Sequence, residues 1–405
     1  MENRLYIVMK VLQINATYGI GSTGIITMEI AHECIQNHIQ AYVAYPRGFG
    51  RVDYGVEGYE IGSWLDHKLH ALLSRIAGKQ AYFSKGPTRR LLRYIGSIKP
   101  DVVHLHNLHS NYIHLDMLLE YLAVNRIKTV ITLHDCWFFT GGCFHYASVG
   151  CEKWKMHCDD CIKRFEDTPA YFMDASYRIH SDRIKYLSRI ENLTFVGVSE
   201  WIARQVGESR LKEAGRITSI HNGFDLQMFR HRVSDLAPWL GLEGKFVILG
   251  PATKWLQAIN RDTLRYFSEH IPDDAVLLLF GASSKQGGLP SNVRLFGYTT
   301  GRMIMAQLYS MADVMVNCSR EDSLSSINIE AQACGTPVVT YDATGNRETV
   351  EAGFSIPAGD YSRLFEETMR IYMQGKEAYS DRCRRFVELN FDRNSNYGKY
   401  ISLYR

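Results

Sequence analysis

The sequence predicts an α/β protein built from two doubly wound domains. Short aliphatic or β-branched runs alternate with amphipathic stretches of helix length, as they do in parallel sheets covered by helices. The alternation occurs in two separate series, and 405 residues are enough for two domains. Two Rossmann-like halves are therefore expected, with ligands at the carboxyl ends of the strands.

The two series define the expected domains. The first has predicted strands at residues 11–14, 41–44, 102–105, 129–132 and 195–198. The helices predicted between them include residues 25–37 and 87–98. The second has predicted strands at residues 246–249, 276–280, 314–316 and 338–340. The seam between the domains is expected between about residues 215 and 243, a stretch that contains the turn-like Asn222-Gly223. The domains are placed at residues 1–215 and 216–380, followed by a helical tail at 381–405.

The composition predicts a soluble cytoplasmic protein. A formal net charge of +3 argues against nucleic-acid binding as the main role. The longest apolar runs, such as residues 275–280, fall short of the roughly 18 residues that a membrane-spanning helix needs. The apolar run at residues 5–8 is too short for a signal peptide. Because Met9 reads as a natural start, residues 1–8 are interpreted as an optional extension.

A glycine-rich turn follows the first predicted strand and opens the first helix. It reads Gly19-Ile20-Gly21-Ser22-Thr23-Gly24 and matches the G-x-G-x-x-G fingerprint of dinucleotide sites. Such a turn lets backbone amides approach phosphates. Three interpretations stay open: a loop that approaches phosphates or an acceptor, an NADP site with Arg47 on the 2′-phosphate, and a tight turn without a ligand.

Histidines follow two neighbouring strands. His104, His106 and His109 come at the end of the third predicted strand, and His134 and Asp135 follow the fourth. Because α/β enzymes keep their chemistry at the carboxyl ends of neighbouring strands, these side chains are expected to share one site. Any one of them could instead be a histidine satisfied by the backbone.

Two carboxylates, Asp322 and Glu330, stand eight residues apart with small residues between them. A Gly335-Thr336-Pro337 turn into a β-branched strand follows. Carboxylates can accept hydrogen bonds from sugar hydroxyls. The amides before Glu330 lie at a predicted helix N-terminus, where anions are favoured. This layout fits a site for a sugar, a ribose and the phosphates that join them.

Taken in order, these motifs resemble those of family 4 glycosyltransferases, which have the GT-B fold. The glycine turn, the His134-Asp135 segment, the Asn222-Gly223 hinge and the paired carboxylates occur in the family's order, although the family usually reads Glu-x7-Glu. The nearest subgroup makes capsule, colanic-acid-like and other exopolysaccharides. The resemblance implies a retaining, metal-independent hexosyl transfer from a nucleotide sugar to a glycan or lipid-linked acceptor. It also implies a cleft between the domains and a tail that returns to the first domain.

The resemblance assigns roles to residues. Glu330 would hold the ribose, Asp322 the donor sugar, and His134 would orient that sugar. The expected donor-binding residues are Gly21, Gly24, Lys254, Arg261, Tyr298, Ser325, Ser326 and Ile327, and the expected acceptor-side residues are His106, His109 and Asp135. Positioning and stabilisation of the leaving diphosphate would carry most of the barrier reduction, and no cofactor is required.

The loop after the strand at 246–249 departs from the family pattern. Family members usually place an Arg and then a Lys-Gly pair there, whereas this chain reads Ile259-Asn260 at the expected pair. Lys254 and Arg261 are the cations that could replace them, and a missing cation could cost about 10²–10³ in rate. Two alternatives therefore stay open: a weak or inactive GT-B binding or scaffold protein, and an NADP-dependent oxidoreductase that uses the Gly19 turn.

Four of the nine cysteines, Cys143, Cys151, Cys158 and Cys161, cluster in a loop at 143–161. The odd total fits a reducing compartment better than a disulfide framework. The cluster is either a structural zinc site with four thiolate ligands or a group of buried thiols, and only the last pair has the C-x2-C spacing of zinc knuckles. In either case it is expected to brace the loop that carries His134.

A basic stretch lies between residues 62 and 100, where eight Lys or Arg stand against one acid, Asp66. The eight are Lys68, Arg75, Lys79, Lys85, Arg89, Arg90, Arg93 and Lys99. Apolar side chains interleave with them. The pattern fits a helix pair on an anionic membrane surface, where an enzyme would meet a lipid-linked acceptor. It fits an ordinary solvated basic face over a core stripe as well.

Overall fold

The computed structural model describes residues 8–51, 55–167, 169–233, 235–282, 288–299, 301–351 and 354–405. Most of the expected N-terminal extension, and part of the apolar run at residues 5–8, therefore lie outside the described residues. The chain divides into two compact units, Met1–Asn222 with Asn396–Arg405 and Gly223–Ser395. The second unit begins seven residues after the expected boundary, and only the last ten residues of the expected tail join the first unit.

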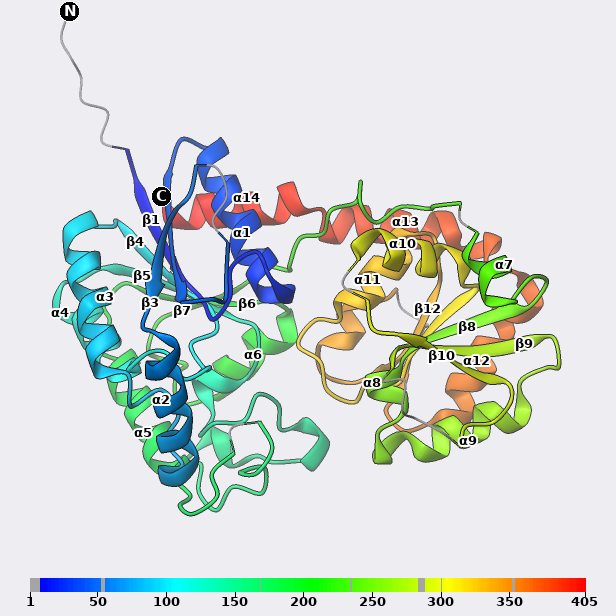
Figure 1. The fold of residues 1–405 in the computed structure, drawn as a ribbon, viewed down its shortest axis with the longest axis horizontal. Helices are drawn as coiled ribbons and strands as arrows, with labels where there is room; N and C mark the ends of the chain where they lie inside the picture. Colours follow the sequence, from blue (N-terminus) through cyan, green and yellow to red (C-terminus); the bar gives the residue numbers. More distant parts are fainter. Residues whose placement is uncertain are drawn as a thin grey trace, which may run out of the picture. The chain divides into compact units, whose positions relative to one another are not determined.

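The first unit holds a seven-stranded parallel sheet with the order β3-β2-β1-β4-β5-β6-β7 (Figure 1). Its strands are β1 (Lys10–Ile14), β2 (Gln40–Pro46), β3 (Glu57–Ile61), β4 (Val102–Leu105), β5 (Lys128–Leu133), β6 (Leu193–Gly197) and β7 (Arg216–Ser219). Strand β3 was not predicted, because this edge strand is largely exposed and carries no continuous apolar run. The buried central strands are aliphatic and were predicted.

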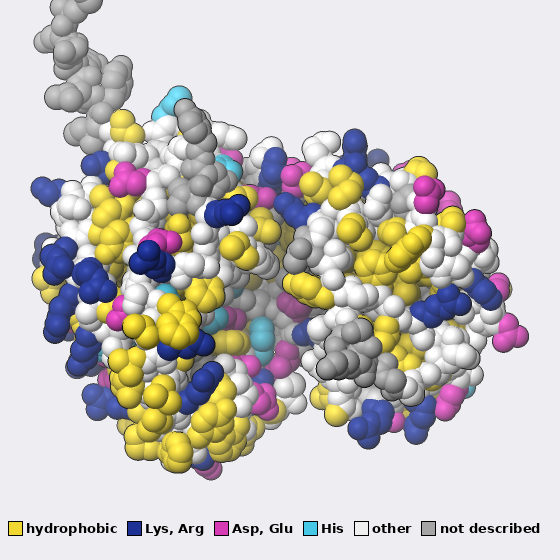
Figure 2. Space-filling model, in the orientation of Figure 1, with side chains coloured by type: hydrophobic (Ala, Val, Ile, Leu, Met, Phe, Trp, Pro, Cys, Tyr) yellow, Lys and Arg dark blue, Asp and Glu magenta, His cyan; other side chains and the backbone are white. Residues whose placement is uncertain are grey.

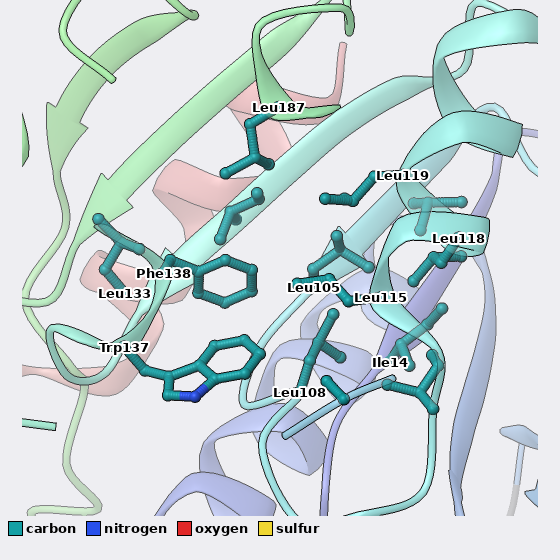
Figure 3. Packing of buried hydrophobic residues seen from close by; sticks show 14 of the residues in the cluster. Ile14, Leu105, Leu108, Leu115, Leu118, Leu119, Leu133, Trp137, Phe138 and Leu187 are labelled. Carbon is teal, nitrogen blue, oxygen red and sulfur yellow. The ribbon is translucent and has the colours of Figure 1, made fainter. Parts of the chain in front are cut away.

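Helices cover both faces of this sheet. The helices of this unit are α1 (Gly21–Gln36), α2 (Trp64–Ala77), α3 (Lys85–Ile98), α4 (Leu115–Val124), α5 (Ser176–Leu187), α6 (Glu200–Glu208) and α14 (Arg393–Tyr404), of which α2 adds no side chain to the two hydrophobic cores on the sheet. On one face, Ile30 and Cys34 of α1 pack in a single core with Tyr400 and Tyr404 of α14. On the other face, leucines of α4 meet the sheet and the residues that follow β5; Figure 3 shows Leu118 and Leu119 near Leu105, with Trp137 and Phe138 further along the same core.

The second unit holds a six-stranded parallel sheet with the order β10-β9-β8-β11-β12-β13. Its strands are β8 (Phe246–Pro251), β9 (Ala275–Ala282), β10 (Val293–Gly297), β11 (Val314–Asn317), β12 (Val338–Asp342) and β13 (Ser355–Pro357). Its helices are α7 (Leu236–Leu240), α8 (Ala252–Trp255), α9 (Arg261–His270), α10 (Arg302–Met311), α11 (Ser326–Ala333), α12 (Tyr361–Gln374) and α13 (Glu377–Phe391).

Both sheets have the doubly wound order, which confirms the predicted α/β class. In each sheet the strand order reverses between the first and the fourth strand, so β1 lies beside β4 and β8 lies beside β11. Doubly wound proteins bind ligands at the carboxyl ends of the strands at this point. Candidate sites are therefore sought after β1 and β4 in the first unit and after β8 and β11 in the second. Among the described helices, none is long and apolar enough to cross a membrane.

Candidate functional site

Side-chain amides hold the loop that follows β11. Asn317, the last residue of β11, donates to the Ser325 hydroxyl at 3.1 Å and to the Asn328 side-chain oxygen at 2.9 Å. Asn346 donates to the carbonyl oxygen of Ser319 at 3.0 Å. The backbone of an irregular segment lacks the hydrogen-bond partners that a helix or a strand provides. Side-chain amides supply such partners here, so the loop has a defined shape.

Asp322 lies in this loop and is tied to the segment after β12. Its amide donates to the Thr344 hydroxyl at 2.8 Å, and its carbonyl oxygen accepts from the Gly345 amide at 2.8 Å. Gly345 has no room for a side chain, since a Cβ there would lie 1.9 Å from the carbonyl oxygen of Ser323. The Asp322 carboxylate accepts from the Leu324 amide at 3.3 Å. These bonds fix the turn that carries Asp322.

Glu330 lies on α11 in a largely enclosed position. Burial raises the pKa of its carboxyl group to about 7, although the Tyr309 hydroxyl donates to Oε2 at 3.0 Å and Arg302 adds a favourable charge. A carboxylate that titrates near neutrality is a candidate functional group. The same helix begins at Ser326. Its first-turn amides, which include those of Ser326 and Ile327, have no partner within the helix and favour an anion.

Two cations lie near the carboxyl end of β11. Burial raises the pKa of the Cys318 thiol, while Lys254 and Arg320 act against this rise, so both charges are close to that thiol. Arg320 also donates to the carbonyl oxygen of Ile259 at 3.2 Å, which ties the loop after β11 to the loop after β8. Arg320 was not among the predicted site residues. It lies three residues after the end of β11, and this position at the carboxyl end of a buried strand could have indicated a role in the site.

Two other expected donor-binding residues lie on exposed parts of the second unit. Arg261 is the first residue of α9 and is exposed. Tyr298 follows the edge strand β10, and its side chain is 80% exposed. Neither side chain makes a hydrogen bond to another residue of the described structure. Both are accessible to a ligand, but the protein does not hold either of them in place.

A chain of three side chains joins the ends of β1, β4 and β5 in the first unit. Gln13 donates to the carbonyl oxygen of Thr27 at 3.0 Å, so its own side-chain oxygen faces His106 Nε2 at 3.0 Å. His106 therefore carries its proton on Nε2 and accepts through Nδ1, which lies 3.1 Å from His134 Nε2. His134 accordingly donates from Nε2 and keeps Nδ1 as an acceptor.

The histidines of this chain are neutral at physiological pH. Burial lowers the pKa of His134 to about 4, with Asp135 acting against the shift. Burial also holds the pKa of His106 well below its usual value. His106 was expected on the acceptor side, but its side chain is fully buried against Gln13 and His134. Its role in the structure is to support His134.

His109 and Asp135 form a second pair in the same region. His109 Nε2 lies 3.1 Å from Asp135 Oδ2, and the other oxygen of Asp135 accepts from the Trp137 amide at 2.8 Å. Burial alone would raise the pKa of Asp135, but His109 and the Trp137 amide bring it below its usual value. The side chains of His109 and Asp135 are 15% and 12% exposed, so both keep some access to solvent.

The two expected donor-binding glycines of the turn after β1 differ in their surroundings. A Cβ on Gly24 would lie 2.7 Å from the Thr17 hydroxyl, so this glycine allows α1 to pack closely against the turn. Gly21 has a φ of +67° and open space where a side chain would be. Asn15, at the end of β1, accepts from the Asn107 amide at 3.2 Å and so ties the turn to the loop after β4.

Arg183 of α5, which was not among the predicted site residues, anchors the loop after His134. Its guanidinium is buried, donates to the carbonyl oxygens of Trp137 and Thr140, and lies 3.6 Å from the centre of the Trp137 ring. Gln80 accepts from the Trp137 indole at 3.0 Å. It also lines a cavity of about 160 Å³ together with Ser74, Arg75, Asn111 and Asp167.

The four cysteines of the 143–161 loop lie close enough to influence one another. Burial raises the pKa values of Cys143 and Cys158 to about 12, and Cys161 adds to both shifts, so these thiols are protonated. Throughout the described part of the chain, no three His, Cys, Asp or Glu side chains are placed so that they could hold a metal ion. Of the four thiols, that of Cys158 is buried, and those of Cys143, Cys151 and Cys161 are partly buried. Cys158 accepts from the Gly141 amide at 3.2 Å, near the loop that carries His134.

Solved structures of low sequence identity have the same fold. Sucrose-phosphate synthase from Thermosynechococcus elongatus superposes with a TM-score of 0.67 at 16% identity, covering 98% of both chains. Anabaena HepE in complex with UDP-glucose superposes with a TM-score of 0.62 at 17% identity, covering 98% of this chain and all of the other. These similarities confirm the expected GT-B class with two Rossmann-like domains.

Sequence comparisons identify the family. Two relatives named D-inositol 3-phosphate glycosyltransferase, from Mycolicibacterium gilvum and Mycobacterium leprae, are 29% identical over 178 and 190 residues. The matches cover 39% and 42% of this chain and only 38% and 44% of those relatives. The family model for glycosyl transferases group 1 matches residues 245–374, and the model for Glycosyltransferase Family 4 matches residues 23–228, about half of the chain. The chain belongs to glycosyltransferase family 4.

Proposed function

We propose that the protein is a retaining hexosyltransferase that takes its sugar from a nucleotide-sugar donor. The observation that carries the proposal is the position of Glu330, an enclosed carboxylate with a raised pKa on α11, behind amides that can face a diphosphate. An NADP-dependent enzyme that uses the Gly19 turn has no need for a carboxylate and anion-binding amides of this kind in the second unit. The oxidoreductase alternative also gains no support from a chain that belongs to a glycosyltransferase family.

The second unit binds the donor in this proposal. Glu330 accepts hydrogen bonds from the ribose hydroxyls, and Asp322 accepts from the donor sugar. The amides at Ser326 and Ile327, with Lys254 and Arg320, stabilise the charge that develops on the leaving diphosphate. Arg261, Ser325 and Tyr298 remain donor-side candidates. The UDP-glucose bound by Anabaena HepE is consistent with a nucleoside diphosphate sugar as the donor.

The first unit orients the reacting groups. His134, a neutral imidazole with a fixed tautomer, orients the transferred sugar, and Gly21 leaves a backbone amide accessible to phosphate or acceptor. The bond between the anomeric carbon and the diphosphate oxygen breaks, and a bond to an acceptor hydroxyl forms on the same face. The proton of that hydroxyl passes to the departing diphosphate. In this scheme positioning and leaving-group electrostatics carry the rate enhancement, without a protein nucleophile and without a metal ion.

The acceptor is proposed to be a glycan or a lipid-linked sugar in polysaccharide synthesis. His109 and Asp135 form a partly accessible polar pair that suits sugar hydroxyls. A catalytically weak or inactive binding protein is the second candidate, because the family's Lys-Gly pair is absent after β8. The proximity of Arg320 to Lys254 favours activity over this second candidate, since together they restore two positive charges at the end of β11.

Binding calorimetry tests the proposal. UDP, GDP, ADP, their common sugar conjugates and NADPH are titrated into wild type, into Glu330→Ala and into Glu269→Ala, an exposed carboxylate on α9 that serves as the matched control. We expect one sugar nucleotide to bind wild type and Glu269→Ala, and Glu330→Ala to bind it at least about tenfold more weakly. Wild-type affinity in Glu330→Ala, or binding of NADPH alone, would overturn the assignment.

A further inference from the structure

Helix α2 presents its apolar side to solvent. Leu65, Leu69, Leu72 and Ile76 follow one another at helical spacing and are 70%, 58%, 54% and 43% exposed. Trp64, at the start of the same helix, is also exposed. None of the side chains of α2 belongs to either described hydrophobic core of the first unit. A surface helix of a soluble protein normally turns such a stripe toward the core.

Polar contacts hold the inner side of α2 against the protein. His70 and Ser74 are the buried residues of this helix. His70 Nδ1 lies 2.6 Å from the Ser84 hydroxyl, and Ser74 donates to the Asn111 side-chain oxygen at 3.0 Å. A capping box formed by Ser63 with Asp66 fixes the first turn. The helix is thus held by contacts outside the stripe, and the outward direction of the apolar stripe is part of the fold.

The apolar surface continues past the end of α2. The Tyr171 amide donates to the carbonyl oxygen of Arg75 at 2.9 Å, which places the segment of Tyr171, Phe172 and Met173 against the last turns of the helix. The side chains of these three residues are 54%, 75% and 52% exposed. In Figure 2 hydrophobic side chains gather over α2 and the chain beneath it. We call this surface, made of the α2 stripe and residues 171–173, the apolar patch.

Basic side chains border the apolar patch. Lys68 and Arg75 are exposed and lie on one flank of the α2 stripe. Arg89, Arg90 and Arg93 are exposed on α3, where Arg90 lies 3.7 Å from Asp66 at the start of α2. Of the eight basic residues between 62 and 100, only Arg90 forms an ion pair with a described acidic residue. The border therefore carries positive charge that the protein itself leaves largely unneutralised.

We propose that the apolar patch and its basic border bind the surface of an anionic lipid bilayer. Leucines and aromatic side chains enter the boundary between headgroups and acyl chains, while the basic side chains contact lipid phosphates. A second copy of the chain is a poorer occupant, because a symmetric contact would set the same basic borders against each other. The proposal goes beyond the transfer reaction and does not depend on it.

Vesicle co-sedimentation tests the proposal. Vesicles of phosphatidylcholine with roughly a third of phosphatidylglycerol are compared with vesicles of pure phosphatidylcholine. The variant Leu69→Asp/Leu72→Asp should lose at least about tenfold in binding to the anionic vesicles, because it places charge in the centre of the apolar patch. Lys68→Gln/Arg93→Gln should bind more weakly at low salt, and about 0.5 M salt should remove its difference from wild type. Leu389→Asp/Met373→Asp, at two exposed apolar positions of the second unit, is the matched control and should bind like wild type.

Any of four results would overturn the proposal. Wild type could fail to bind anionic vesicles at low salt, or bind both kinds of vesicle equally. The aspartate variant could bind like wild type. Light scattering could show that wild type is a dimer and the aspartate variant a monomer, in which case the patch is a contact between copies. Quenching of Trp64 by brominated lipid gives a second measure, since Trp64→Phe should remove the quenching if α2 inserts.

Discussion

Gln13 sets the tautomer of His134 through His106. The amide of Gln13 must donate to the carbonyl oxygen of Thr27, which leaves only its oxygen for His106. His106 in turn can only accept from His134. A backbone carbonyl thus determines which nitrogen of a buried imidazole carries the proton. An imidazole that orients a sugar benefits from this, because its donor and acceptor sides do not exchange during turnover.

Replacing His106 tests this chain of hydrogen bonds. His106→Leu leaves the buried Nε2–H of His134 without an acceptor, at a cost of about 1–3 kcal/mol, which is enough to turn the ring or move its proton. We expect kcat to fall at least about tenfold with little change in the donor KM. Ring ¹⁵N chemical shifts of His134 report the tautomer directly.

His106→Gln is the matched variant. A glutamine can donate to Gln13 and accept from His134, so it should keep the Nε2–H tautomer and most of the rate. Equal losses of rate in His106→Gln and His106→Leu, with an unchanged His134 tautomer in both, would show that His106 contributes only to packing.

The pH dependence of stability should report Glu330. Burial raises the pKa of Glu330 from 4.5 to about 7, so the folded state holds a proton that the unfolded state has lost between these values. The free energy of unfolding should therefore fall by roughly 3 kcal/mol as pH rises through this window, and Glu330→Gln should lack that fall. Urea unfolding of both proteins at the two ends of the window measures it.

Glu366→Gln, at an exposed position of α12, controls for the loss of one carboxylate. It should keep the pH dependence of the wild type. Glu330→Gln should be more stable than wild type above the window and similar to it below. A constant difference across the whole window would mean that Glu330 is not perturbed by burial.

The central strands could be predicted from the sequence, while the outer elements could not. Strands β8 and β11 are buried on both faces and read as continuous aliphatic runs. The edge strand β3 is exposed on most positions and has no such run. For α2 the spacing of leucines predicts a stripe but not its direction. His70 and Ser74, which face inward, look like solvent-facing residues in the sequence.

The site was predicted at the level of loops rather than contacts. His134, Asp322 and Glu330 follow strand ends, and strand ends can be located from hydrophobic runs. The residues that position them are remote in sequence: Gln13 lies 93 residues from His106, and Arg183 lies 43 residues from Thr140. Polar residues at or near the end of an aliphatic strand, such as Gln13 and Asn15, were the signal that could have indicated these supports.

A methyl group at Gly345 should disrupt the loop that carries Asp322. The Cβ of Gly345→Ala would lie 1.9 Å from the carbonyl oxygen of Ser323, so the backbone must move and the Gly345 bond to Asp322 is lost. We expect at least about a tenfold loss of donor affinity and a lower melting temperature. Gly297→Ala, where a Cβ meets no atom within 4 Å, is the control and should match wild type. Unchanged donor affinity in Gly345→Ala would remove this loop from the donor site.

Lys254 and Arg320 should determine the preference for a diphosphate. Each is expected to stabilise the second phosphate by a charge-assisted bond of about 1.5–3 kcal/mol. Lys254→Met and Arg320→Met should therefore each lower the affinity for the nucleoside diphosphate roughly tenfold to hundredfold. The affinity for the nucleoside monophosphate should fall much less. Arg261→Met should have a smaller effect, because Arg261 is exposed and not held in place. Arg320→Lys keeps the positive charge but removes the guanidinium that donates to the carbonyl oxygen of Ile259, so it distinguishes the effect of the charge from that of the hydrogen bond. Arg363→Met, which removes an exposed cation on α12, is the control. Calorimetry with both nucleotides measures the ratio. A diphosphate preference that survives in both methionine variants would leave the amides of α11 as its source and would reopen the case for a binding protein that has lost its catalytic cations.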